Sequence, residues 1–196
     1  MSFELTRQVS VRSLELRERR AVDSLIRLFN ITFEDTNTQL VRGDGEPVYQ
    51  PATRLIPYHQ ILFAHGFFNS ALHEVAHWCI AGAQRRTQVD YGYWYCPDGR
   101  DEQQQQAFEQ VEVKPQAIEW AFSAACGRSF SVSTDNLDGV EPDRARFTQS
   151  VQQQLDTYFK LGFPSRAQQF IDACVAEFDA KPLSFSACLS INKDLA

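Results

Sequence analysis

The feature that most constrains this chain is the pentapeptide HEVAH at residues 73–77. Residues four apart lie on one face of an α-helix, one turn from each other, so His73 and His77 can reach a single metal ion. Glu74 lies about 100° further round the helix, where it can act beside the metal as a base or as a partner to a ligand. This HExxH pattern predicts a helix that carries a metal site. The structural alternative is a pair of helix histidines that are hydrogen-bonded to neighbouring residues.

A third ligand has to come from elsewhere in the chain. Two histidines alone hold a metal weakly, and a catalytic site needs a third protein ligand and an open coordination position. The extended pattern HExxHxxGxxH is absent, because no histidine follows His77. Glu119 is the first candidate, since it lies in a strongly apolar stretch, where a carboxylate is costly unless it is paired or binds a metal. A Glu119 paired with a basic residue is the structural alternative, and the other candidate ligands are Glu109, Glu112, Asp90 and His65.

A ligand set of two histidines and one carboxylate supports two kinds of chemistry. It suits a non-haem Fe(II) site that reacts with O2, and it equally suits a hydrolytic zinc site. In the hydrolytic interpretation Glu74 is the general base for a metal-activated water. In the oxygenase interpretation Glu74 orients a ligand or handles protons. The chain contains neither the HxD pattern of the jelly-roll oxygenases nor a clear 2-oxoglutarate signature.

Composition limits the class of protein. A length of 196 residues with 43% hydrophobic residues suits one domain over residues 1–196. The net charge of −6 argues against broad nucleic-acid binding. The sequence has neither an apolar run of about 20 residues nor an apolar start typical of a signal peptide, so we expect a cytoplasmic protein with no membrane span. The five cysteines form no CxxC, which argues against a thiolate zinc site.

The periodicity of apolar residues predicts an α+β fold, in which helices pack round a small mixed sheet with the metal site on a central HExxH helix. Glycine and proline positions divide the chain further. We expect helices at 13–30, from 67 or 69 to 84, 101–113, 115–127, 142–161 and 165–178. We expect a β-hairpin at 39–49, strands at 58–65 and 90–95, a strand or edge segment at 128–140, and a loosely ordered tail after 182.

Four residues that follow the motif are candidate substrate contacts. Tyr93 and Tyr95 alternate along the segment DYGYWY, so their row of aromatic rings either lines the metal cleft or packs across strands. Arg85 and Arg86 are well placed to interact with the C-terminal end of the motif helix. Binding of a substrate anion is the alternative for these two arginines.

Three sequence blocks in a fixed order point to one family. They are FAHGFFNSALHEVAHWCIAGAQRR at 63–86, DYGYWYCPDGR at 90–100 and FEQVEVKPQAIEW at 108–120. Together the blocks resemble the elongation factor P hydroxylase family, and the combination is far more specific than HExxH alone. The resemblance extends over most of the chain.

The resemblance implies a function and a site. Members of the family hydroxylate the β-lysylated lysine side chain of translation elongation factor P, with O2 as co-substrate and a non-haem iron site of two histidines and one carboxylate. Their fold resembles a metal-dependent bacterial ribonuclease with an HxxxH helix. Carried over to this chain, His73 and His77 match the helix motif and Glu119 matches the EW of the third block. The rival hypotheses are a zinc-dependent peptidase or ribonuclease with Glu74 as base, and a non-catalytic binding protein with structural histidines.

Overall fold

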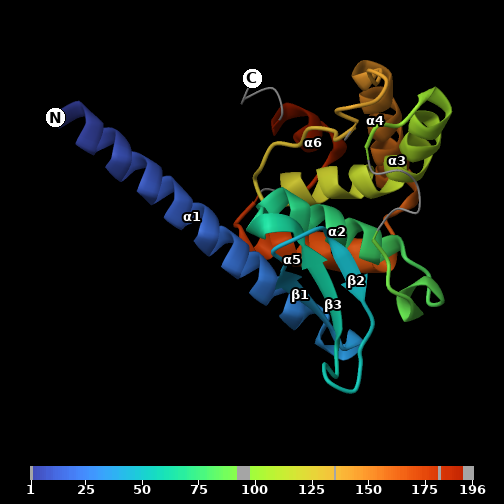
Figure 1. The fold of residues 1–196 in the computed structure, drawn as a ribbon, viewed down its shortest axis with the longest axis horizontal. Coiled ribbons are helices and arrows are strands. Elements are labelled where there is room, and N and C mark those ends of the chain that lie inside the picture. Colours follow the sequence, from blue (N-terminus) through green and yellow to red (C-terminus); the bar gives the residue numbers. More distant parts are fainter. Residues whose placement is uncertain (1, 92–97, 135, 181, 192–196) are drawn as a thin grey trace.

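Helices make up most of the chain, and one small sheet lies at one side of them (Figure 1). The structure is a computed structural model that describes residues 2–91, 98–134, 136–180 and 182–191, with side chains from residue 12 onward. The α-helices of this part are α1 Ser2–Thr32, α2 Phe68–Ile80, α3 Glu102–Ala125, α4 Arg144–Leu161, α5 Ser165–Glu177 and α6 Phe185–Ile191. The strands are β1 Thr38–Arg42, β2 Val48–Gln50 and β3 His59–Phe63. Short 3₁₀ turns occur at Glu34–Thr36, Ala64–Gly66 and Arg85–Thr87. The mixed α+β class is therefore confirmed.

The sheet is not the predicted hairpin. Its order is β1-β3-β2, with β3 parallel to β1 and antiparallel to β2. The expectation that residues 39–49 form a β-hairpin is wrong, because the apolar strand β3 lies between the two segments. The predicted buried strand at 58–65 is confirmed as β3.

Gly43 shows why the glycine-rich segment does not make a tight hairpin turn. Its N–H donates to the carbonyl of Phe63 at 2.9 Å, and its own carbonyl accepts from the N–H of His65 at 3.1 Å. The chain thus continues beside β3 past the end of β1. A Cβ at position 43 would lie 3.3 Å from the Phe63 oxygen, so glycine permits this close approach.

Helix α2 carries the HExxH motif through the centre of the molecule and packs against α3, β3 and α5. It ends at Ile80, so the predicted extension to Gln84 is wrong. The guanidinium of Arg166 donates to the carbonyls of Cys79 and Ala81 at 3.0 and 2.7 Å, which satisfies the helix end. The buried side chains of α2 are Phe68, Ala71, Leu72, Val75, Ala76, Trp78 and Cys79.

Helix α3 is continuous through Pro115, so the predicted break at that residue is wrong. The helix begins with a capping box, in which the Asp101 carboxylate accepts from the N–H of Gln104 and the Gln104 side chain accepts from the N–H of Asp101. A proline inside a helix removes one backbone hydrogen bond and costs about 3 kcal/mol. Every residue from Pro115 to Ala125 is buried, and this burial offsets the cost.

Three predicted segments remain: the strand at 90–95, the strand or edge segment at 128–140 and the tail after 182. The predicted strand at 90–95 lies mostly outside the described residues, although Asp90 forms an isolated antiparallel bridge with Tyr49. Among the described residues of 128–140 no strand forms, which contradicts that prediction. The tail after Pro182 is not loosely ordered over its described part, because α6 forms there and the indole N–H of Trp120 donates to the carbonyl of Cys188 at 3.0 Å.

One cluster of buried apolar side chains draws on all six of these helices and on the sheet. It includes an aromatic group around Trp78, whose ring lies 5.2 and 4.8 Å from those of Phe29 and Phe33. None of the helices in the described residues is both long and apolar enough to cross a membrane. The single domain over residues 1–196 stays a prediction.

Candidate metal centre

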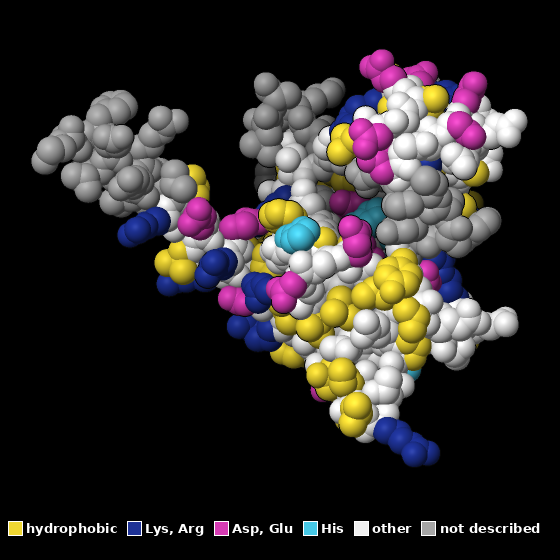
Figure 2. Space-filling view, in the orientation of Figure 1, with side chains coloured by type: hydrophobic (Ala, Val, Ile, Leu, Met, Phe, Trp, Pro, Cys, Tyr) yellow, Lys and Arg dark blue, Asp and Glu magenta, His cyan; other side chains and the backbone are white. Residues whose placement is uncertain are grey.

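The two motif histidines face each other on one side of α2. Their Nε2 atoms are 3.0 Å apart, and the ring centroids are 4.6 Å apart at an interplanar angle of 72°. The His73 side chain is 25% exposed and that of His77 is 12% exposed, so both reach the surface. Figure 2 shows histidine and acidic side chains next to each other in the middle of this face. The helical spacing thus brings the imidazoles together as the sequence predicts, in a place that a substrate can reach.

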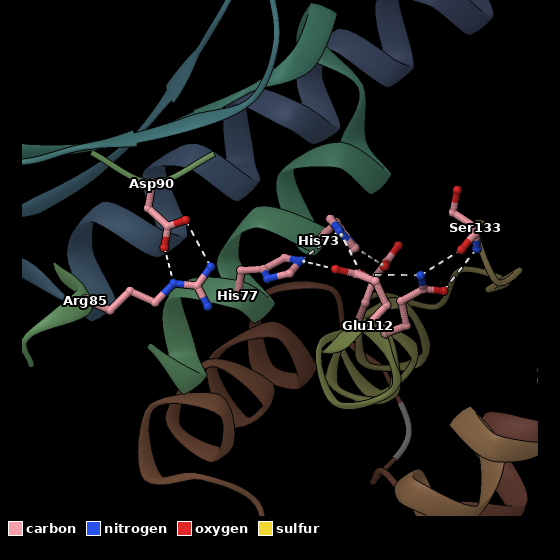
Figure 3. Close-up of polar contacts among 8 residues, drawn as sticks. His73, His77, Arg85, Asp90, Glu112 and Ser133 are labelled. Carbon is pink, nitrogen blue, oxygen red and sulfur yellow. Dashed lines mark hydrogen bonds and ion pairs between the residues drawn. The ribbon is translucent and has the colours of Figure 1, made fainter. Parts of the chain in front are cut away.

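Glu112 of α3 completes a group of three ligand atoms. Its Oε1 lies 3.3 Å from Nε2 of His77, and its Oε2 lies 3.6 Å from Nε2 of His73 (Figure 3). One ligand atom from each of the three residues lies within 4.8 Å of the others. Two imidazole nitrogens and a carboxylate oxygen that converge in this way are a donor set suited to Fe(II) or Zn(II). The residues therefore fit a divalent metal.

Glu119 lies on the other side of the His73 ring. Its Oε2 is 2.8 Å from Nδ1 of His73, whereas the nitrogen that faces His77 and Glu112 is Nε2. A carboxylate in this position accepts a hydrogen bond from Nδ1, which fixes the tautomer and the ring orientation of a histidine that binds metal through Nε2. The structure thus brings Glu119 to the site, but not into the group of converging ligand atoms.

Charge within this cluster strongly shifts two pKa values. Burial lowers the pKa of His73, but the negative charges of Glu119, Glu112 and Glu74 outweigh it, and with the hydrogen bond to Glu119 they raise the pKa to about 10. Burial raises the pKa of Glu112, but the charges of the two histidines, together with hydrogen bonds from His77 and Gln116, lower it to about 2. Without a metal, a protonated His73 partly compensates the buried carboxylates. A divalent cation would take over that role.

Gln116 holds Glu112 in place from one turn further along α3. Its side-chain Oε1 accepts from the N–H of Ser133 at 3.0 Å, and its Nε2 donates to the Ser133 carbonyl at 2.8 Å. The same Nε2 donates to Oε2 of Glu112 at 3.4 Å. The two backbone contacts determine which way the amide points, so its donor side faces the carboxylate. Segment 128–134 is thus attached to α3 by a side chain rather than by strand pairing.

The other candidate residues lie around this group. Arg85 forms a bidentate ion pair with Asp90, on the side of His77 that is opposite to Glu112 (Figure 3). Arg86 donates to the carbonyl of Ala81, which confirms its predicted interaction with the end of the motif helix. The remaining candidates are Glu109, which pairs with Arg146, His65, which lies in the 3₁₀ turn before α2, and Tyr93 and Tyr95, which lie outside the described residues.

Comparisons with known proteins identify the family of this chain. The profile of the family described as elongation factor P hydroxylase matches residues 28–187. A protein of Haemophilus influenzae named elongation factor P lysine hydroxylase is 47% identical over 161 residues, which cover 82% of this chain and 90% of the relative. The matched region contains α2, α3 and the three residues with converging ligand atoms. By both measures the chain belongs to the elongation factor P hydroxylase family.

Proposed function

We propose that this protein hydroxylates the β-lysylated lysine side chain of elongation factor P with a metal held by His73, His77 and Glu112. The convergence of one atom from each of these residues is the observation that carries the metal site. The name of the Haemophilus influenzae relative supports a lysine of elongation factor P as the target. Fe(II) is the proposed metal, because two histidines and one carboxylate leave coordination positions open for O2. We further propose that the reaction takes place in the cytoplasm, where translation factors act.

A metal bound there would supply the activation of O2, and the side chains around it hold its ligands in place. Glu119 holds Nδ1 of His73, so Nε2 keeps its lone pair for the metal. Gln116 limits rotation of the Glu112 carboxylate. The two partly exposed imidazoles leave one side of the group open to a side chain presented by another protein. This arrangement does not require the substrate to enter a closed cavity.

The proposed reaction is tested by the mass of the substrate. Purified protein loaded with Fe(II) is incubated with β-lysylated elongation factor P, O2 and a reductant, and the intact mass of the factor is measured. We expect the gain of one oxygen atom, which fragmentation assigns to the modified lysine. The absence of any gain, with metal demonstrably bound, would contradict the proposal.

A zinc-dependent peptidase or ribonuclease with Glu74 as general base is the second candidate, because the same ligand set suits zinc. The likeness of the fold to the metal-dependent bacterial ribonuclease also stays a prediction. Zinc-loaded protein incubated with peptide and RNA substrates tests this candidate. Cleavage that Glu74→Gln eliminates, with zinc still bound, would replace the proposed hydroxylation.

Replacing Glu119 by glutamine should weaken metal binding without abolishing it. The amide can still accept a hydrogen bond from Nδ1 of His73, but it has no negative charge to support the ligand. Loss of such a partner typically lowers metal affinity about 10- to 100-fold. Titration of the metal-free variant with Co(II), followed by visible absorption, measures the change. A complete loss of binding would instead support Glu119 as a direct ligand.

Metal affinity should rise with pH between about 6.5 and 8.5. Because the pKa of His73 is raised to about 10, its imidazole is protonated in the metal-free protein over this range. The metal must displace that proton, so the apparent affinity increases about tenfold per pH unit. Glu112, with a pKa near 2, is already ionised and adds no dependence. Calorimetry in buffers of different ionisation enthalpy should show about one proton released, and no release would contradict the assignment.

A further inference from the structure

A pocket lies directly beside the candidate metal group. It lies between the edge of the sheet and the C-terminal half of α2, is partly open to solvent, and has a volume of about 20 Å³, which is room for about one group the size of a water molecule. His77 is shared between the pocket and the group of converging ligand atoms. The Arg85–Asp90 ion pair also lines the pocket and lies on the far side of His77 from Glu112 (Figure 3). A molecule in this pocket would therefore contact the wall of the metal site.

Glu74 is the carboxylate of this pocket that has no partner. Among the described residues its side chain makes neither a hydrogen bond nor an ion pair, although it is partly buried and lines the pocket. Buried polar groups in native proteins nearly always have a partner. An unpartnered carboxylate beside a metal group thus points to a partner that arrives from outside.

The other charged groups of the pocket already have partners. Arg85 and Asp90 form an ion pair with each other, and Arg86 donates to the carbonyl of Ala81 at the end of α2. Glu74 is therefore the charged side chain of the pocket that makes neither a hydrogen bond nor an ion pair among the described residues. The walls next to it include the apolar side chains of Ile61, Trp78 and Ala81. An ammonium group is about the size of a water molecule, so the end of an aliphatic amine matches both the volume of the pocket and its free carboxylate.

We propose that this pocket binds the ammonium group of an aliphatic amine on the substrate, and that Glu74 is the carboxylate that binds it. The inference rests on the proposed function, because the side chain to be hydroxylated must present such an amine beside the metal. Ile61, Trp78 and Ala81 lie next to the carbon that carries the ammonium group, and the rest of the chain leads out of the pocket. A charge-assisted hydrogen bond to Glu74 then selects modified lysines with a free amine over those with a neutral acyl group.

Two peptides that differ only in one amine test this inference. One contains a lysine acylated on its side chain with a 6-aminohexanoyl group, and the other contains the same lysine acylated with a hexanoyl group. Binding to the metal-loaded protein is measured by fluorescence anisotropy. We expect wild type to bind the amine peptide about 10- to 100-fold more tightly, as for a hydrogen bond between charged groups. Glu74→Gln should abolish this preference, and Glu74→Asp should retain part of it.

A control variant separates local recognition from overall charge. Glu46 lies in the exposed segment between β1 and β2, so Glu46→Gln makes the same change in net charge away from the pocket and should leave the preference intact. Equal binding of both peptides by wild type would overturn the inference. So would a preference that persists at full strength in Glu74→Gln.

Kinetics with β-lysylated elongation factor P distinguish recognition from a role in proton transfer. Recognition predicts that Glu74→Gln raises KM about tenfold or more and leaves kcat within a few-fold. A fall in kcat at unchanged KM would overturn the inference and indicate that Glu74 moves a proton. An amine preference that depends on Glu74, in a protein that adds no oxygen to the factor, would support the subsite while rejecting the proposed reaction.

Discussion

Replacing Glu112 by glutamine should abolish stoichiometric metal binding and lower the rate of hydroxylation by more than about 100-fold, beyond the usual effect of losing a residue that only supports a ligand. The amide is similar in size to the carboxylate, so packing is retained. It has no negative charge, however, and is a poor ligand for Fe(II) or Zn(II). The remaining histidine pair would hold a metal only weakly. Metal content after desalting and the yield of hydroxylated elongation factor P measure the two effects.

Glu109→Gln is the matched control for this change. Glu109 lies in the same helix, is also buried, and pairs with Arg146 and Gln105 rather than with the histidines. This variant should retain metal and activity. If Glu112→Gln retained full metal content while Glu119→Gln lost it, Glu119 would be the third ligand and the assignment of Glu112 would be wrong.

Replacing Gly139 by alanine should destabilise the protein by about 3 kcal/mol, at the upper end of the usual cost of overpacking. A Cβ at this position would lie 2.3 Å from Oδ1 of Asn136 and 2.4 Å from the carbonyl oxygen of Arg100. Neither neighbour can move easily. Asn136 accepts from the N–H of Arg100 and donates to the carbonyls of Arg100 and Val140, and the Arg100 side chain is itself fully buried. Urea denaturation followed by circular dichroism measures the loss.

Gly45→Ala provides the comparison, because a Cβ at position 45 would meet no atom within 4 Å. Its effect on the free energy of unfolding should stay below about 1 kcal/mol. Similar stabilities for the two variants would show that the residues around Gly139 can move apart to make room for a methyl group.

The choice of the third ligand shows where sequence reasoning stops. The sequence favours Glu119 because its neighbours are apolar, whereas Glu112 stands among polar residues that are typical of a solvated helix. In the structure both are buried, because this side of α3 faces the histidines of α2. The polar side chains recur at spacings of four and three residues along the helix: Gln105, Glu109, Glu112, Gln116, Glu119 and Ser123. Residues with that spacing lie on one face of a continuous helix, so the spacing indicates one polar stripe along α3.

Because the sequence predicts a break at Pro115, it does not predict that these polar residues form one stripe. Two separate helices would not keep Glu112 and Glu119 on one face, whereas a continuous helix places residues seven apart almost two full turns along the same face. The prediction of His73 and His77 needed only local geometry within one helix. The choice between Glu112 and Glu119 as third ligand depends on how a second helix packs against the first, and local propensity does not contain that information.

The sheet shows the same distinction between local and distant information. The apolar run of β3 predicted a buried strand correctly, because the pattern lies within one segment. Its partners could not be read from that pattern. The glycines between β1 and β2 favoured a hairpin, but β3 is the strand that can pair on both of its edges.

The position of β3 between β1 and β2 has a consequence for how this protein folds. Every pairing in the sheet closes a loop of several residues, from Gln50 to Gln60 on one edge and from Arg42 to Phe63 on the other. In the described part of the chain no two-residue turn joins a pair of hydrogen-bonded strands, so the entropy of loop closure must be lost before these strand contacts form. Helix contacts close to each other in sequence do not have this cost. We therefore expect the sheet to form late and to limit the folding rate.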